Sequence, residues 1–262
     1  MEEGMLRGGG VLAVLLLLAV AERRWPLTAT GPARPRWTTH LGLLLAGLLL
    51  LRGLALLVPA GVALGAAGWA AEQDWGLLQG LPLWIGIPAS LLLLDLLIYA
   101  QHRLLHGHPL LWRLHRVHHR DPALELSSAW RFHPIELLVS SLLKALTVLV
   151  LGLPLLGVLL FETLLAAAAL FTHANLRLAP RWEQGLRPWL VTPALHRRHH
   201  ARDAAEVPCN YGTLLSLWDR LFGTLQAPPL QAQPAPVGLS GEEAAPALRL
   251  RDCLLDPWRR PP

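Results

Sequence analysis

The feature that most constrains this chain is one long apolar stretch, from Ile135 to Phe171. A helix that crosses the hydrocarbon part of a bilayer needs about 20 apolar residues, so this stretch is too long for a single crossing. The segment Gly152-Leu153-Pro154 interrupts it near its middle, and glycine and proline both end helices. We therefore predict a helical hairpin that enters the membrane and returns to the face it left.

Three further segments are apolar enough to be membrane helices. They run from about Gly8 to Ala21, from Leu41 to about Val58, and from Leu81 to Ala100. Charged residues make up 16% of the chain, where a soluble domain has about 25%. Because Glu2 and Glu3 precede the first segment, it lacks the basic start of a signal peptide. We predict an all-α, polytopic membrane protein with about four or five transmembrane helices and a cytoplasmic histidine-rich helical cap.

The distribution of arginine orients these spans. Arginines lie between the first two spans, between the third and fourth, and after the fifth, whereas the loop after the second span carries Glu72 and Asp74 and no basic residue. Positive charge marks cytoplasmic loops, so we expect the N-terminus outside and the C-terminus in the cytoplasm. The net charge of +5 is interpreted in the same way, and not as a nucleic-acid surface. The chain is rich in leucine, alanine, arginine and proline, and Lys144 is its only lysine. This bias is typical of a bacterial genome of high GC content, so we expect a bacterial inner membrane, or the endoplasmic reticulum if the source is eukaryotic.

The chain divides into three predicted parts. Residues 1–80 hold the first transmembrane helices and their loops, residues 81–226 form the main domain with the hairpin at 135–171, and residues 227–262 form a tail rich in proline and alanine. Only Cys209 and Cys253 are present, which excludes a disulfide framework.

Eight of the 12 histidines fall into three short clusters. The clusters are His102 and His106; His115, His118 and His119; and His196, His199 and His200. The His-x-x-His-His pattern occurs twice, although roughly 0.03 copies per chain are expected by chance. Spacings of three and four residues place side chains on one face of a helix, and imidazole suits iron, zinc, copper or nickel. Eight ligands exceed what one ion takes, so we predict two metal ions.

Other polar residues surround these clusters. An acid inside a membrane span is a candidate functional residue, and we expect Asp95 to accept a ring N–H from a metal-binding histidine. His133 and Glu136 open the predicted hairpin, and His173 and Asn175 close it. His133 and His173 would extend the set of metal ligands to ten histidines.

These motifs resemble those of the fatty acid hydroxylase and sterol desaturase superfamily of integral-membrane di-iron oxygenases. The resemblance covers about Leu92 to Thr224. It rests on Asp95-x-x-x-Tyr99-x-x-His102-Arg103-x-x-His106, Leu111-Trp112-Arg113-x-His115-x-Val117-His118-His119, Arg131-x-His133-Pro134-x-Glu136, His173-Ala174-Asn175, Thr192-Pro193-x-x-His196-x-x-His199-His200, Asn210-Tyr211-Gly212 and Trp218-Asp219-Arg220-Leu221-Phe222-Gly223-Thr224.

The resemblance implies an oxidoreductase with two iron ions and dioxygen as co-substrate. It would hydroxylate or desaturate an unactivated C–H bond of a lipid taken from the bilayer. The electrons would come from a separate protein of the ferredoxin or cytochrome type. Asp95, Glu136 and Asn175 would orient ligands or water. The resemblance implies no nucleic-acid partner.

Several alternatives stay open. Hydroxylation and desaturation begin with the same hydrogen abstraction, so the motifs do not separate them. A membrane haem protein would place paired histidines inside its spans, and a metal transporter would thread acidic residues or histidines through several spans. The absence of His-Glu-x-x-His argues against a membrane metalloprotease. Sterols, hopanoids, carotenoids, fatty acyl chains and ether lipids all remain candidate substrates.

Overall fold

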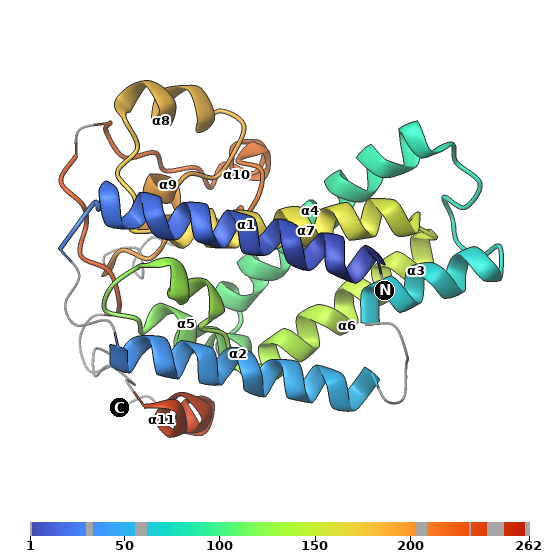
Figure 1. Cartoon of the computed structure of the whole chain (residues 1–262), viewed down its shortest axis with the longest axis horizontal. Coiled ribbons are helices and arrows are strands. Elements are labelled where there is room, and N and C mark those ends of the chain that lie inside the picture. Colours follow the sequence, from blue (N-terminus) through green and yellow to red (C-terminus); the bar gives the residue numbers. More distant parts are fainter. Residues whose placement is uncertain are drawn as a thin grey trace.

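A computed structural model describes residues 2–29, 34–55, 62–202, 209–230, 232–239 and 249–259. Within these ranges the regular structure is helical, and β-pairing is limited to isolated bridges. The predicted all-α class is confirmed (Figure 1). The elements are α1 (Glu2–Arg24), α2 (Arg34–Ala55), α3 (Val62–Glu72), α4 (Leu83–Gly107), α5 (Pro109–His119), η1 (Leu126–Trp130), α6 (Pro134–Leu151), α7 (Leu155–His173), α8 (Pro180–Leu186), α9 (Pro193–His199), α10 (Leu217–Leu221), α11 (Leu250–Leu255) and η4 (Asp256–Trp258).

Three of the described helices, α4, α6 and α7, are long and apolar enough to cross a membrane. Large apolar side chains on α6 and α7 are exposed, including Leu146 and Leu164, as expected of helices whose outer faces meet lipid. The first two predicted spans coincide with α1 and with α2, although the second extends to Val58, which lies outside the described residues. The total of four or five spans stays a prediction.

Two helices joined by a tight turn lie where the hairpin was predicted, and the passage of this hairpin through a membrane stays a prediction. Helix α6 ends at Leu151, and Gly152 follows it in the left-handed conformation with φ of 64°. Pro154 precedes the first residue of α7. The loop before α4 closes the turn, because the backbone N–H groups of Leu77 and Leu78 donate to the carbonyls of Val150 and Leu151 at 3.1 and 2.8 Å. These bonds satisfy carbonyl groups that the end of a helix leaves unpaired.

Helix α3 was not predicted from the sequence. Its 11 residues are too few to span a bilayer. Ala63, Ala67 and Ala70 recur at helical spacing and are buried, so α3 packs closely on α6. Its core partners include Val148 and Phe161, which are fully buried.

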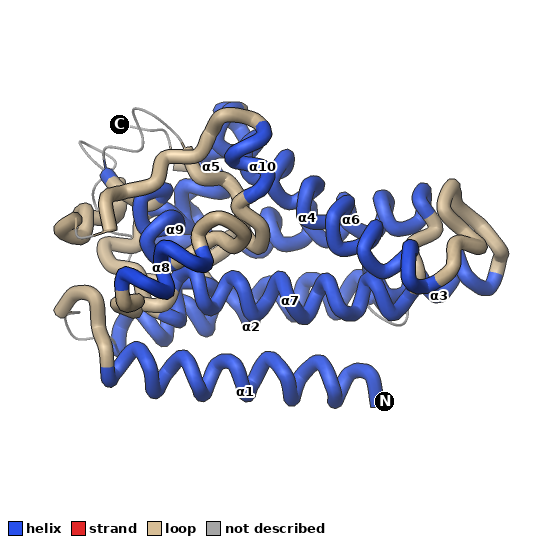
Figure 2. Tube along the Cα trace, turned by 90° about the horizontal axis from the view of Figure 1, so that it is seen from above, coloured by secondary structure: helices blue, strands red, loops and turns tan. Residues whose placement is uncertain are grey.

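The histidine-bearing elements gather at one end of the molecule. Helix α3 and the turn of the hairpin lie at the other end (Figures 1 and 2). Helices α6 and α7 diverge from the turn at Gly152 (Figure 1). Helix α6 therefore begins at the histidine end and α7 ends there, as expected for the predicted hairpin.

We expect Gly152→Ala to destabilise the protein. A left-handed conformation costs a residue with a side chain roughly 1–2 kcal/mol, and a Cβ at this position would also lie 2.5 Å from the backbone oxygen of Trp75. The midpoint of thermal unfolding in detergent should therefore fall. Gly68→Ala is the matched control, because it lies within α3 and its Cβ would meet nothing within 4 Å. An equal effect of the two substitutions would contradict this account of the turn.

Candidate metal centre

Three helices, α4, α5 and α9, carry the eight clustered histidines, with His200 as the C-cap of α9, and the predicted helical turns are confirmed. Helix α4 continues past the predicted end of its apolar segment to Gly107 and so carries His102 and His106. Pro109 begins α5 at a position where proline is tolerated. Thr192 caps α9, because its side chain accepts a hydrogen bond from the backbone N–H of Leu195.

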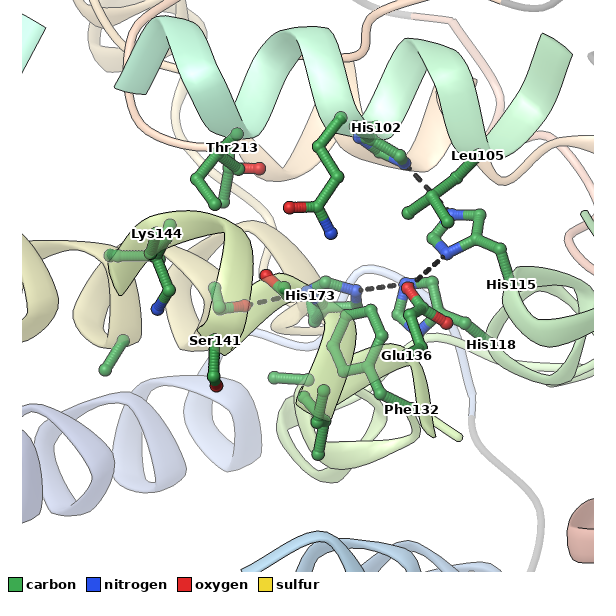
Figure 3. Close-up of a pocket in the computed structure, with 18 of the residues that line it drawn as sticks. His102, Leu105, His115, His118, Phe132, Glu136, Ser141, Lys144, His173 and Thr213 are labelled. Carbon is green, nitrogen blue, oxygen red and sulfur yellow. Dashed lines mark hydrogen bonds and ion pairs between the residues drawn. The ribbon is translucent and has the colours of Figure 1, made fainter. Parts of the chain in front are cut away.

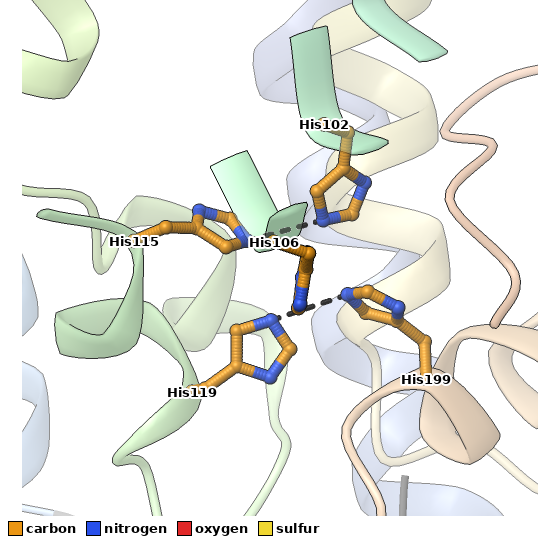
Figure 4. A group of neighbouring side chains, drawn as sticks. All are labelled: His102, His106, His115, His119 and His199. Carbon is orange, nitrogen blue, oxygen red and sulfur yellow. Dashed lines mark hydrogen bonds between the residues drawn. The ribbon is translucent and has the colours of Figure 1, made fainter. Parts of the chain in front are cut away.

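Nine of the ten predicted histidines come together in two neighbouring groups. The donor atoms within each group all lie within 4.8 Å of one another. The first group is His102, His106, His115, His119 and His199 (Figure 4). The second group is His118, His173, His196 and His200. The groups adjoin, since the rings of His119 and His200 stack with centroids 4.3 Å apart.

Within both groups the histidines face one another through their Nε2 atoms. The Nε2–Nε2 distances are 3.1 Å for His102–His115, 3.2 Å for His119–His199, 3.1 Å for His118–His173, 3.0 Å for His173–His196 and 3.2 Å for His196–His200.

The opposite ring nitrogen of five of these histidines bonds to an oxygen that can only accept. The Nδ1–oxygen distances are 2.8 Å for His102 to the Tyr211 carbonyl, 2.8 Å for His115 to Glu136 Oε1, 3.2 Å for His118 to the Arg131 carbonyl, 2.7 Å for His173 to the Ala169 carbonyl and 2.7 Å for His199 to the Cys209 carbonyl. A neutral imidazole carries one proton, so each of these rings is protonated on Nδ1. Each ring therefore presents a lone pair on Nε2.

This tautomer pattern calls for a cation. In their neutral forms His118 and His173 direct two lone pairs at each other with no proton between them. Metal–imidazole bonds are about 2.1 Å long, so two ligands at a right angle place their nitrogens about 3.0 Å apart. The observed separations match this value. The two groups thus fit transition-metal ions, which neutral imidazole binds well.

Burial favours the neutral form of five of the nine grouped histidines. It lowers the pKa of His118, His119, His196 and His200 well below the ordinary value, and neighbouring histidines lower it further. Burial also lowers the pKa of His199 to about 3, although its bond to the Cys209 carbonyl opposes the shift. Neutral imidazole is the form that coordinates metals, so the rings need not lose a proton to bind one near neutral pH.

Glu136 contacts the first group. It is buried near the start of α6 and accepts the Nδ1–H of His115 at 2.8 Å. Its other oxygen, Oε2, is buried with no hydrogen-bonding partner among the described residues. A carboxylate behind a ligating histidine fixes the ring orientation and raises its basicity.

Asp95 and Asn175, which were also predicted as site residues, form their hydrogen bonds outside the two histidine groups. Asp95 accepts hydrogen bonds from the indole of Trp218 at 2.9 Å and the backbone N–H of Leu215 at 3.2 Å, and not from a histidine. It lies about two helical turns from His102 along α4. The side chain of Asn175 bonds to Thr28, which ties the segment after α1 to the end of α7.

His133 lies outside both histidine groups. It precedes α6, and its Nδ1 accepts a hydrogen bond from the backbone N–H of Ile135 at 3.2 Å. Its Nε2 faces the carbonyl of Leu254 at 3.3 Å. Its described contacts are those of a helix cap that also touches the C-terminal segment.

Sequence reasoning did not identify how the Tyr211 carbonyl that orients His102 is held. Asp219 accepts hydrogen bonds from the backbone N–H groups of Tyr211 and Gly212, both at 2.8 Å. A Cβ on Gly212 would lie 2.7 Å from this carboxylate, so the contact requires glycine. The motifs containing these residues were noted only as part of the family resemblance.

The C-terminal segment supports the back of α5. Arg116 is buried and donates to Asp256 Oδ2 at 2.9 Å and to the Asp256 carbonyl at 2.7 Å. Arg120 also pairs with this carboxylate. Because α5 carries three clustered histidines, these bonds fix the helix that supplies both groups. This pairing was not predicted from the sequence.

A cavity of about 250 Å³ adjoins the two groups (Figure 3). It lies among α4, α6 and α7. Five of the nine grouped histidines line it: His102, His115, His118, His173 and His196. Its apolar lining includes Ile98, Leu105, Phe132, Leu137, Leu165 and Ala166. Its polar lining, besides Glu136, includes Gln101, Ser140, Ser141, Lys144, Glu162 and Thr213.

Comparison with known protein families agrees with this geometry. A family model described as fatty acid hydroxylase matches residues 87–224. This range contains all nine histidines of the two groups. No solved structure matches the chain with significance.

The chain is also similar to known lipid-modifying enzymes. It is 30% identical to an ornithine lipid hydroxylase of Rhizobium tropici over 89% of this chain and 70% of that protein. It is 30% identical to human alkylglycerol monooxygenase over 49% of this chain, and 32% identical to the zebrafish enzyme over 50%. The matches span only 28% of each of these two monooxygenases.

We expect the purified protein to hold about two metal ions, because each histidine group offers enough nitrogen ligands for one. His118→Ala should remove the ion of the second group, and His119→Ala that of the first. Metal content measured by mass spectrometry should fall to about one ion or fewer per chain in each variant.

His133→Ala is the control, because His133 is a buried histidine outside both groups. It should retain the metal content of the unchanged protein. Full metal content in both the His118 and His119 variants would contradict the assignment of the two groups.

Proposed function

We propose that this chain, which belongs to the fatty acid hydroxylase family, is a di-iron enzyme that hydroxylates a C–H bond of a membrane lipid. It is an oxidoreductase of this family and an integral membrane protein. Dioxygen would be the co-substrate, and a separate protein would supply electrons. The oxygenase domain would correspond to residues 81–226, between the N-terminal helices and the C-terminal tail.

One observation carries the proposal: both groups of neutral imidazoles border the same cavity between membrane helices. His102 and His115 reach it from the first group, and His118, His173 and His196 from the second. A lipid in the cavity would therefore lie beside both metal sites. Two irons bound there would supply the redox chemistry that activates dioxygen towards an unactivated C–H bond.

The chain's own residues would prepare the site for that chemistry. Glu136 and the backbone carbonyls hold each ring so that Nε2 faces inward. The position of the cavity among α4, α6 and α7 would limit its contact with bulk water, which would protect a reactive oxidant from side reactions. The apolar lining provides a surface that a lipid can cover.

The similar proteins favour hydroxylation of a polar lipid. Their names describe a hydroxylase of ornithine lipid and monooxygenases of alkylglycerol. Both names indicate insertion of oxygen, which favours hydroxylation over desaturation. Since the first alignment spans 70% of the ornithine lipid hydroxylase, an amino-acid-containing lipid is the substrate that we would test first.

Electrons would arrive at the cytoplasmic side. The orientation rests on the arginine-rich loops next to the histidine clusters. Among the nine grouped histidines, His106 is the least buried, and its ring lies 5.0 Å from that of Trp112. A ferredoxin or cytochrome docking near this edge would come close to the first histidine group.

The proposal is tested by expressing the chain in a bacterium and profiling its lipids by mass spectrometry. We expect a lipid whose mass increases by one oxygen atom, and we expect His199→Ala to abolish this product. Loss of two hydrogen atoms would identify a desaturase instead. Unchanged lipid masses with metal-loaded protein, supplied reductant and an ornithine-containing lipid would contradict lipid hydroxylation.

A further inference from the structure

Gln101 brings to the cavity a buried polar atom that the described residues leave unsatisfied, in addition to Glu136 Oε2. Gln101 lines the cavity and immediately precedes His102 on α4. Its Oε1 is buried and has no hydrogen-bonding partner among the described residues. Buried acceptors are nearly always paired, and leaving one unpaired costs free energy. A ligand that donates a hydrogen bond to this oxygen would remove the cost.

The end of the cavity away from the metal-binding histidines is charged. Lys144 Nζ, on α6, pairs with Glu162 Oε1, on α7, at 2.5 Å. Both residues line the cavity, and Lys144 is the only lysine in the chain. Ionisable groups inside membrane helices are costly, and they commonly mark a substrate path. A cavity meant only for hydrocarbon would gain nothing from them.

These groups border one continuous space. Glu136 and Lys144 lie on α6 about two turns apart, or roughly 12 Å. Figure 3 places Lys144 at one end of the space and His102 and His115 at the other. A molecule in the cavity therefore meets hydrogen-bonding groups both beside the histidines and at the Lys144 end, although most of the lining is apolar. An alkyl tail would bury Gln101 and the ion pair against hydrocarbon, which is unfavourable for polar groups.

We propose that the cavity receives the polar part of the lipid and not the middle of its acyl chain. An amide N–H or a hydroxyl O–H of the lipid donates to Gln101 Oε1, and further polar atoms lie towards Lys144 and Glu162. Because Gln101 is adjacent to His102, the carbon presented to the histidines lies close to this donor group. The binding claim stands by itself, whereas the position of oxidation rests on the proposed function.

The binding claim is tested with two probes that differ by one donor. N-Dodecylacetamide carries an N–H, and N-methyl-N-dodecylacetamide has the same chain and carbonyl without it. Binding to the full-length, metal-loaded protein in detergent is measured by calorimetry. We expect the N–H probe to bind at least about fivefold more tightly, because the methylated probe leaves Gln101 unsatisfied.

Gln101→Leu should bind the two probes with about equal affinity, because the substitution removes the acceptor. Gln184→Leu is the matched control, since Gln184 is exposed on α8, and it should retain the preference. Equal affinity of the two probes for the unchanged protein would overturn the proposal, whether or not Gln101→Leu folds. A preference that survives in folded Gln101→Leu protein would overturn the role of Gln101.

The double variant Lys144→Met with Glu162→Leu tests the charged end. It removes both charges at once, so neither is left buried without a partner. We expect the affinity for dodecane to rise and the affinity for N-dodecylacetamide to fall, each by a few fold. An unchanged ratio of the two affinities would exclude a role for the ion pair in substrate selection.

Product analysis separates this inference from the proposed function. With reductant and dioxygen, tandem mass spectrometry should locate the new oxygen of N-dodecylacetamide near the amide nitrogen. Oxygen at the far end of the alkyl chain would overturn the inference and leave the hydroxylase intact. Retained probe preference without any product from this amide or from an ornithine-containing lipid would overturn the hydroxylase and leave the binding site intact.

Discussion

The structure depends on the way in which the Nε2 atoms of buried imidazoles face one another at about 3 Å. Backbone carbonyls and Glu136 accept hydrogen bonds from the Nδ1 atoms of five rings. In their neutral forms, pairs such as His118 and His173 therefore direct the lone pairs of their Nε2 atoms at each other from 3.1 Å. Such an arrangement is unfavourable without a cation and becomes favourable with one. Burial in the protein keeps the rings neutral and strengthens both effects.

The rest of the fold serves to hold this arrangement. The turn at Gly152 lets two membrane helices leave the histidine end and return to it, which brings Glu136 and His173 to rings from distant parts of the sequence. Asp219 holds the loop whose carbonyl fixes His102, and Asp256 holds the arginines behind α5. The divergence of α6 from α7 also accompanies a cavity beside the histidines. Support for the metal groups and access for a lipid thus arise from the same helices.

The sequence predicted the hairpin and the clustered histidines because glycine and proline end helices and because histidine spacing fixes a helical face. It predicted ten histidines at one site, and the structure brings nine of them together, but a shared helix face does not determine which side chains touch. Asp95 therefore bonds to Trp218, and His133 caps α6 next to Leu254. Helix α3 was not predicted, because its 11 residues are too few to be identified as a membrane span. The carbonyl groups that bond to the Nδ1 atoms could not be predicted from the sequence, because every residue carries a backbone carbonyl.

X-ray absorption at the metal edge of the purified protein tests the central claim most directly. The two histidine groups predict a first coordination shell dominated by nitrogen at about 2.1 Å, with the outer-shell scattering typical of imidazole rings. The average number of imidazole ligands should lie between the four of one group and the five of the other. A first shell dominated by carboxylate oxygen or sulfur, or one with only one or two imidazoles per ion, would contradict the account.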